Sequence, residues 1–218
     1  MARTASTSEL IEQLSASRSE KRLSAARNLR RHGHVEAGPA ILDALQRELK
    51  DIRTWNAQHE MILALGELRC REALPLLWEL AARETPHTIL YSALGDAIVR
   101  LGTDTQVAIE NVFRVIGTGN YPLMHGAFHA MAMLRLVPTN EQIERIQQAA
   151  SDPRAEMEVK GSPTDRTGNR LWVAIAAAGW PRDLVRPFLE ECLAIPDQGL
   201  QLAATNSLKG KYTKWANW

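Results

Sequence analysis

Several features that would assign this chain of 218 residues to a class are scarce or missing. It has only two cysteines, Cys70 and Cys192, and they lie far apart, so we expect two buried thiols in a reducing compartment rather than a disulfide framework. The longest apolar run, LWVAIAAAGW, has about half the length that a membrane-spanning helix needs. The first residues, MARTASTSELIEQL, contain no apolar core of a secretion signal. These absences predict a cytoplasmic protein without a membrane segment.

An excess of charge of one sign is also lacking. The chain has 26 Lys and Arg residues against 25 Asp and Glu residues, so its formal net charge is +1. No overall field therefore draws it toward nucleic acid or anionic lipid. The sequence also has no glycine-rich phosphate loop and no Gly-x-Ser-x-Gly nucleophile motif. We therefore expect a binding protein without cofactors rather than an enzyme.

Signals for β-structure are scarce, and signals for helices are abundant. No Asn-Gly or Asp-Gly turn links two alternating apolar runs. Helix-forming residues dominate, and apolar residues recur at spacings of three and four. Proline is tolerated in the first turn of a helix, where its missing N–H would have had no partner. Pro75, inside EALPLLWEL, is therefore interpreted as marking a helix start, and the sequence predicts an all-α chain.

The pattern around Pro75 recurs. AGPAILDAL surrounds Pro39 and LVRPFLEECL surrounds Pro187, with a large aliphatic residue two positions after each proline. The same pattern fits without proline when it is anchored at Val107 and Glu141. The first four anchors recur about every 34 residues, which is the scale of a helical repeat. The last interval is longer, and its excess falls in a polar stretch, which predicts an inserted loop at 152–162.

A second helical segment precedes each anchored helix, so the repeating unit is a helix pair. A short helix near 8–15 and a final helix near 198–209 would cap the two ends of the array. We predict a single domain over residues 1–218 on this basis. Its repeats are predicted at 18–50, 51–84, 85–119, 120–151 and 163–196, with a C-terminal cap at 197–218.

Two segments carry a family resemblance. They are MILALGELRCREALPLLWEL (61–80) and LSAARNLRRHGHVEAGPAILDAL (23–45), in which a first helix ends with Ala-Leu-Gly or similar and the second opens with Glu-Ala-x-Pro. This resembles the HEAT family, especially its short bacterial form. The resemblance implies an α-solenoid of about five HEAT-like helical hairpins. The alternative is a compact helical bundle.

One face of the second helices is predicted to contact a partner. In a stacked solenoid each repeat buries its apolar stripe against its neighbours, and we expect the opposite side of the second helix to line the concave surface. A helix advances by about 100° per residue, so the fourth and eighth positions after each anchor lie on that side. The residues there are Asp43, Arg47, Glu79, Arg83, Asn111, Arg145 and Glu191. Their mixed charge suits a polypeptide better than duplex nucleic acid, which predicts an adaptor, a regulator or an inhibitor. The alternative is that these residues are merely solvated.

Four residues are of the types and spacings that can bind a metal ion. His59 and Glu60 resemble the His-Glu pairs with which HEAT-type deoxyhypusine hydroxylases hold a di-iron centre, but that family needs several pairs and the sequence has one. His125 and His129 lie one helical turn apart, but Gly126 stands where His-Glu-x-x-His has its glutamate. We therefore predict no metal site and no metal cofactor.

The C-terminal tail, LKGKYTKWANW, favours a second function. Basic residues interleaved with aromatic ones bind single-stranded nucleic acid by charge and stacking. The candidates are Lys211, Tyr212, Lys214, Trp215 and Trp218. HEAT-like alkylpurine DNA glycosylases resemble this chain in length and helical content, which keeps nucleic-acid binding or DNA repair as an alternative function. The tail aromatics would otherwise seal the open end of the last repeat.

Overall fold

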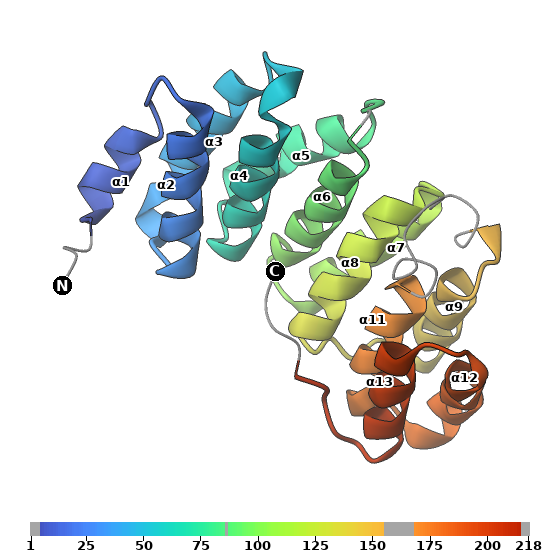
Figure 1. The fold of residues 1–218 in the computed structure, drawn as a ribbon. Helices are drawn as coiled ribbons and strands as arrows, with labels where there is room; N and C mark the ends of the chain where they lie inside the picture. Colours follow the sequence, from blue (N-terminus) through green and yellow to red (C-terminus); the bar gives the residue numbers. More distant parts are fainter. Residues whose placement is uncertain (1–4, 86, 155–167, 215–218) are drawn as a thin grey trace.

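The computed structural model describes residues 5–85, 87–154 and 168–214, which form α-helices, short 3-10 turns and loops but no β-strand (Figure 1). The helices are α1 (Thr7–Gln13), α2 (Ser19–Arg31), α3 (Gly38–Glu48), α4 (Trp55–Glu67), α5 (Leu74–Ala81), α6 (Ile89–Arg100), α7 (Thr105–Gly117), α8 (Tyr121–Met133), α9 (Asn140–Ala150), α11 (Gly168–Ala176), α12 (Arg182–Ala194) and α13 (Gln198–Leu208). The prediction of an all-α chain is confirmed. Within the described ranges, no helix is both long enough and apolar enough to cross a membrane. Most of the predicted loop at 152–162 lies outside the described residues.

Proline positions explain where several helices begin. Pro39 and Pro75 lie in the first turns of α3 and α5, as predicted, and each follows a short 3-10 turn. Pro187 differs, because α12 begins at Arg182 and contains this proline in its interior. The repeating pattern around Pro187 therefore identified a helix, and this helix begins directly after Pro181.

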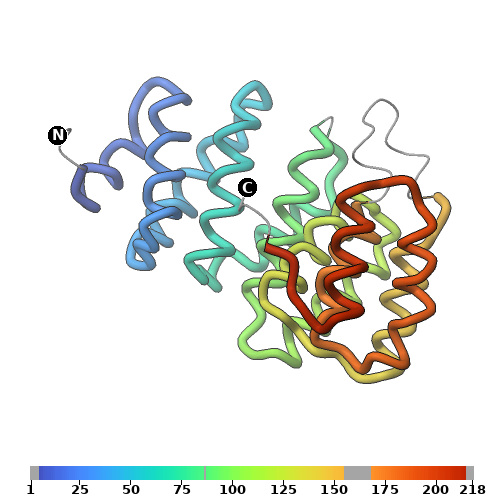
Figure 2. Tube along the Cα trace, turned by 60° about the horizontal axis from the view of Figure 1, so that its bottom comes forward, coloured from blue at the N-terminus to red at the C-terminus, as the bar shows by residue number. Residues whose placement is uncertain are grey.

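The helices form two sets that differ in burial. The helices α2, α4, α6, α8, α11 and α13, which we call the first helices, pack one after another in a row. The remaining long helices, α3, α5, α7, α9 and α12, are the second helices and lie along one side of that row (Figure 1). Figure 2 shows the chain advancing from α1 at one end to α12 and α13 at the other. In α4, α6 and α8 most residues are buried, so this middle part of the row lies deepest in the continuous apolar core.

The helices α6 and α8 approach until their backbones touch. A Cβ atom added at Gly126 of α8 would lie 2.7 Å from the backbone nitrogen of Asp96 and would also collide with the carbonyl of Ser92. A Cβ atom at Gly95 of α6 would in turn meet the backbone of α8, 2.9 Å from the nitrogen of Ala127. Glycine is required at both positions because any side chain would push the two helices apart.

The same principle links α4 to α6. A Cβ atom at Gly66 of α4 would lie 2.6 Å from the Cα atom of Ala97 in α6. Small residues therefore set the spacing of three consecutive first helices. Polar side chains on these helices are brought within hydrogen-bonding range as a result.

We predict that Gly126→Ala lowers the free energy of unfolding by about 1–3 kcal/mol, because the added methyl group meets backbone atoms that cannot rotate away. Gly117→Ala is the matched control, since Gly117 ends α7 with nothing within 4 Å of the added Cβ atom. The control should change the free energy by less than about 1 kcal/mol, and in the stabilising direction. Urea unfolding followed by circular dichroism measures both, and equal stabilities for the two variants would contradict the close approach.

Candidate functional site

A buried cluster of polar side chains lies where α6 meets α8. Asp96 of α6 is 2% exposed, and its Oδ2 lies 2.6 Å from Nδ1 of His129 in α8. Its Oδ1 accepts a hydrogen bond from Nε of Arg100 at 2.5 Å. Because a carboxylate only accepts hydrogen bonds, Nδ1 of His129 carries a proton and its Nε2 faces away from Asp96. We call Asp96, Arg100 and His129 the polar cluster.

The charge of Asp96 is held by its partners. Burial by itself would raise the pKa of this carboxyl, but the hydrogen bond from His129 and the nearby charge of Arg100 lower it overall. Asp96 is therefore ionised at neutral pH although it lies in the core. Removal of either partner would leave the buried carboxylate with only one group to compensate its charge, and loss of a partner is the costly change for a buried ion pair.

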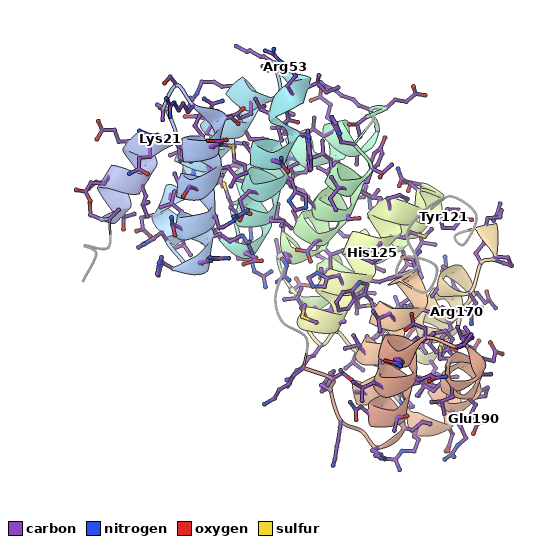
Figure 3. The ribbon with its side chains drawn as sticks, viewed as in Figure 1. Lys21, Arg53, Tyr121, His125, Arg170 and Glu190 are labelled. Carbon is purple, nitrogen blue, oxygen red and sulfur yellow. The ribbon has the colours of Figure 1, made fainter. Side chains whose placement is uncertain are left out.

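Trp172 of α11 connects the polar cluster to the next helix in the row. Its ring meets the His129 ring edge-on, with 4.5 Å between centroids, and its Nε1 donates a hydrogen bond to Nε2 of His125 at 3.1 Å. Figure 3 labels His125 on α8 and Arg170 on the neighbouring α11. The two histidines therefore make hydrogen bonds to different residues, His125 with Trp172 and His129 with Asp96. No group of three or more His, Cys, Asp or Glu side chains within the described ranges is placed to hold a metal ion.

His59 and Glu60, neighbours in α4, also serve different purposes. Glu60 is buried and accepts hydrogen bonds from Nε of Arg30 at 2.7 Å and from Nε of Arg27 at 3.2 Å, so it joins α4 to α2. His59 is half-buried, and its ring makes no hydrogen bond with the part of the chain that the structure describes. Burial lowers the pKa of His59 although Glu60 opposes the effect, so its ring is neutral at pH 7.

A small pocket opens between α4, α6 and α8, beside the polar cluster. It is lined by His59, Leu63, Ser92, Ala93, Asp96, Gly126 and His129. Ser92 donates its hydroxyl proton to the carbonyl of Pro122 at 3.1 Å. The pocket is thus lined by residues of the first helices. The sequence pattern instead predicted a contact surface on the second helices. A sequence signal for the pocket existed only in His59 and His129, since Asp96 and Ser92 belong to no motif.

Six of the seven candidate contact residues, which lie on the second helices or, for Arg83, just after α5, are exposed: Asp43, Arg47, Glu79, Arg83, Arg145 and Glu191. Asn111 is the exception, because it is 3% exposed and donates from Nδ2 to the carbonyl of Ile98 at 3.0 Å. The expectation that Asn111 is solvated is therefore wrong. The buried stripe of α7 begins one residue earlier than predicted, so Asn111 occupies the place that Ala44 has in α3.

Two arginine–aromatic pairs link consecutive second helices. The Arg114 guanidinium of α7 lies 4.1 Å from the ring centroid of Trp78 in α5, and that of Arg145 in α9 lies 4.6 Å from the ring centroid of Phe113 in α7. Both rings are half-buried. The buried Nε1 of Trp78 has no hydrogen-bond partner among the described residues. We call these two pairs the aromatic ladder. The sequence does not predict these pairs, because the arginine and the ring of each pair belong to different helices.

Other candidate contact residues already have partners on the protein. Glu79 and Arg83 form an ion pair one helical turn apart, and Glu191 lies 3.8 Å from Nη1 of Arg170. Asp43 and Arg47 form no ion pair with any residue in 5–85, 87–154 or 168–214. The row is therefore mixed in charge and partly neutralised.

The described part of the C-terminal tail packs back on the chain. The Arg135 guanidinium lies 4.4 Å from the centroid of the Tyr212 ring, and the Tyr212 hydroxyl sits where a side chain at Gly179 would be. Thr213 is buried and accepts a hydrogen bond from Nδ2 of Asn206 at 3.0 Å. Lys211 and Lys214 are exposed, and the candidates Trp215 and Trp218 lie outside the described residues.

Both cysteines are buried free thiols, as predicted. Burial raises the pKa of Cys70 and of Cys192 to about 11, so neither is a thiolate at neutral pH. Their chemistry is therefore that of small apolar core residues.

No family model matches this sequence, and no curated protein matches it.

We predict that Asp96→Asn lowers the free energy of unfolding at pH 7 by about 3–5 kcal/mol, because it leaves two cationic or donating partners buried without their carboxylate. The pKa of Asp96 is lower in the folded state than in the unfolded state, so its contribution is present above about pH 4 and is lost as the pH falls through the folded value. The gap between wild type and variant should therefore narrow in acid. Urea titrations between about pH 7 and pH 3 measure this, with the exposed Asp43→Asn as control, and parallel stability curves would contradict the assignment.

Proposed function

We propose that this chain is a HEAT-like α-solenoid that binds a polypeptide partner and catalyses no reaction. The row of first helices, each packed on the next, supports a repeating architecture that grows in one direction. Such an architecture presents equivalent side chains from successive units along one surface. Two free thiols favour a reducing compartment, so we place this binding in the cytoplasm.

The observation that carries the proposal is the aromatic ladder on the second helices. Tryptophan, other aromatic residues and arginine are enriched in the central part of protein interfaces. Trp78 and Phe113 are half-buried in the free protein and are each covered by an arginine from the next second helix. A partner that packs on these pairs would remove the remaining exposed aromatic surface from water.

Charges around the aromatic ladder suit a polypeptide. Along the second helices and the turn after α5 there are three exposed acidic side chains and three exposed arginines: Asp43, Glu79, Glu191, Arg47, Arg83 and Arg145. A polypeptide carries charges of both signs and complements such a surface, whereas a nucleic-acid backbone would be repelled by the carboxylates. The ladder and the charges together define the proposed contact surface.

We predict that Glu79→Lys combined with Glu191→Lys weakens binding of the partner at least tenfold, which corresponds to about 1.4 kcal/mol. Glu12→Lys combined with Glu20→Lys is the matched control, because both residues are exposed, lie on α1 and α2, and change the net charge equally. The partner is isolated with the tagged full chain from its own cells and identified, and its Kd is then measured by calorimetry. A second test variant, Arg114→Ala with Arg145→Ala, removes the two guanidinium groups of the aromatic ladder, which lie over the rings of Trp78 and Phe113.

Thermal unfolding of each variant shows whether the fold is kept. Loss of affinity in both test variants and retention in the control support the proposed surface. An unchanged Kd in both test variants, or recovery of the chain with no polypeptide bound, contradicts the proposal.

A further inference from the structure

Exposed cations gather around the turn that follows α13. Lys209, Lys211 and Lys214 come from this turn. Arg135 reaches it from the turn after α8, and Arg182 reaches it from the first turn of α12. None of these five residues forms an ion pair with any residue that the structure describes. We call them the basic turn.

Backbone and side-chain contacts fix the shape of the basic turn. Gly210 has a φ of 66°, and the N–H groups of Lys209 and Lys211 both donate to the carbonyl of Asn206, at 3.0 Å and 2.9 Å. The Nδ2 of Asn206 also holds the buried Thr213. The lysines therefore project from a backbone that is ordered before any ligand arrives, which limits the entropy lost on binding.

Two arginines from other elements, Arg135 from the turn after α8 and Arg182 from the start of α12, are placed beside the lysines. Arg135 stacks on the ring of Tyr212, and Nη2 of Arg182 lies 3.7 Å from the point where a Cβ atom of Gly210 would sit. The three contributing segments, 134–138, 177–183 and 209–214, contain one acidic residue, Asp183. Elsewhere the buried cations are matched, as Arg30 is by Glu60 and Glu67. A local excess of positive charge therefore exists in a chain whose formal net charge is only +1.

We propose that the basic turn binds the phosphate backbone of a single-stranded nucleic acid. Guanidinium forks and lysine ammonium groups are the side chains that hold phosphate oxygens, and a nucleic-acid strand offers one phosphate per nucleotide. A duplex would need the basic surface to continue along the molecule, but three of the six exposed candidate contact residues are acidic. A flexible strand needs only the span of the turn.

The position of Tyr212 indicates that the basic turn contacts the nucleic acid through charge and not through stacking of bases on the ring. One face of its ring is covered by Arg135, and its hydroxyl end lies against Gly179. This part of the tail therefore binds without a preference for the base sequence, because phosphate contacts carry no sequence information directly.

The test is fluorescence anisotropy of the full chain with a labelled oligothymidine of about 12 nucleotides, a length within the range of small single-strand sites. The variant Lys209→Glu with Lys211→Glu should weaken binding at least tenfold at low salt. The control, Lys21→Glu with Lys50→Glu, carries the same change of net charge on two exposed lysines of α2 and of the turn after α3, and should stay within twofold of wild type. The slope of log Kd against log salt concentration should fall by about 1.4 in the test variant, at about 0.7 per lost phosphate contact.

Three outcomes overturn the proposal. The first is absence of binding by the wild type at low salt, and the second is an equal loss in both double variants. The third is tighter lysine-dependent binding to duplex DNA, to poly-glutamate or to phosphatidylserine vesicles than to the oligonucleotide. The proposal is independent of the polypeptide surface on the second helices, and Glu79→Lys with Glu191→Lys should leave oligonucleotide binding intact.

Discussion

Direct contact between the backbones of α6 and α8 is the constraint on which the middle of this structure depends. Gly95 and Gly126 lack the side chains that would hold the two helices apart, so a hydrogen bond of 2.6 Å can form between Asp96 and His129. A buried ion pair contributes favourably only when its geometry is good and its remaining hydrogen-bonding groups are satisfied. The glycines provide the geometry, and Arg100 satisfies the second carboxylate oxygen. The polar cluster is thus a consequence of how closely two helices approach.

A common arrangement of charge recurs along the first helices. In the pairs Arg27–Glu60 and Arg100–Asp96 the carboxylate is at most 5% exposed, while the arginine side chain is 44% and 14% exposed. Arginine suits this position because its apolar stem covers neighbouring side chains while its guanidinium reaches water. In these pairs the buried carboxylate holds neighbouring helices together, and the arginine is the more solvent-exposed partner. The basic turn extends that character to a place where the cations form no ion pair with the described residues.

Local features of the helices were predictable, and their mutual orientation was not. Pro39 and Pro75 predicted helix starts, because only in the first turn of a helix does proline cost no backbone hydrogen bond. Asn111 was misplaced because the pattern in α7 was anchored at Val107, one residue too late, and because its hydrogen bond to Ile98 depends on how α6 packs beside α7. Asp96 could not be paired with His129 from sequence, since the rotation of α6 against α8 is set by glycine contacts.

His59 and Glu60 show the same limit within one helix. Adjacent residues point about 100° apart, so Glu60 turns toward α2 while His59 turns toward the pocket. The basic turn shows it between helices, because the tail lysines were visible in sequence but Arg135 and Arg182 joined them only through folding. Sequence pattern identifies the elements and their apolar stripes, whereas pairings across elements depend on packing.

The glycine contact also bears on how the molecule can deform. Side chains between helices allow small sliding movements, because rotamers can readjust, but two touching backbones have nothing to readjust. The joint between α6 and α8 is therefore stiff, and a change of curvature must take place on either side of it. A ligand that binds both the segment before α6 and the segment after α8 would therefore change the curvature of the molecule outside this contact.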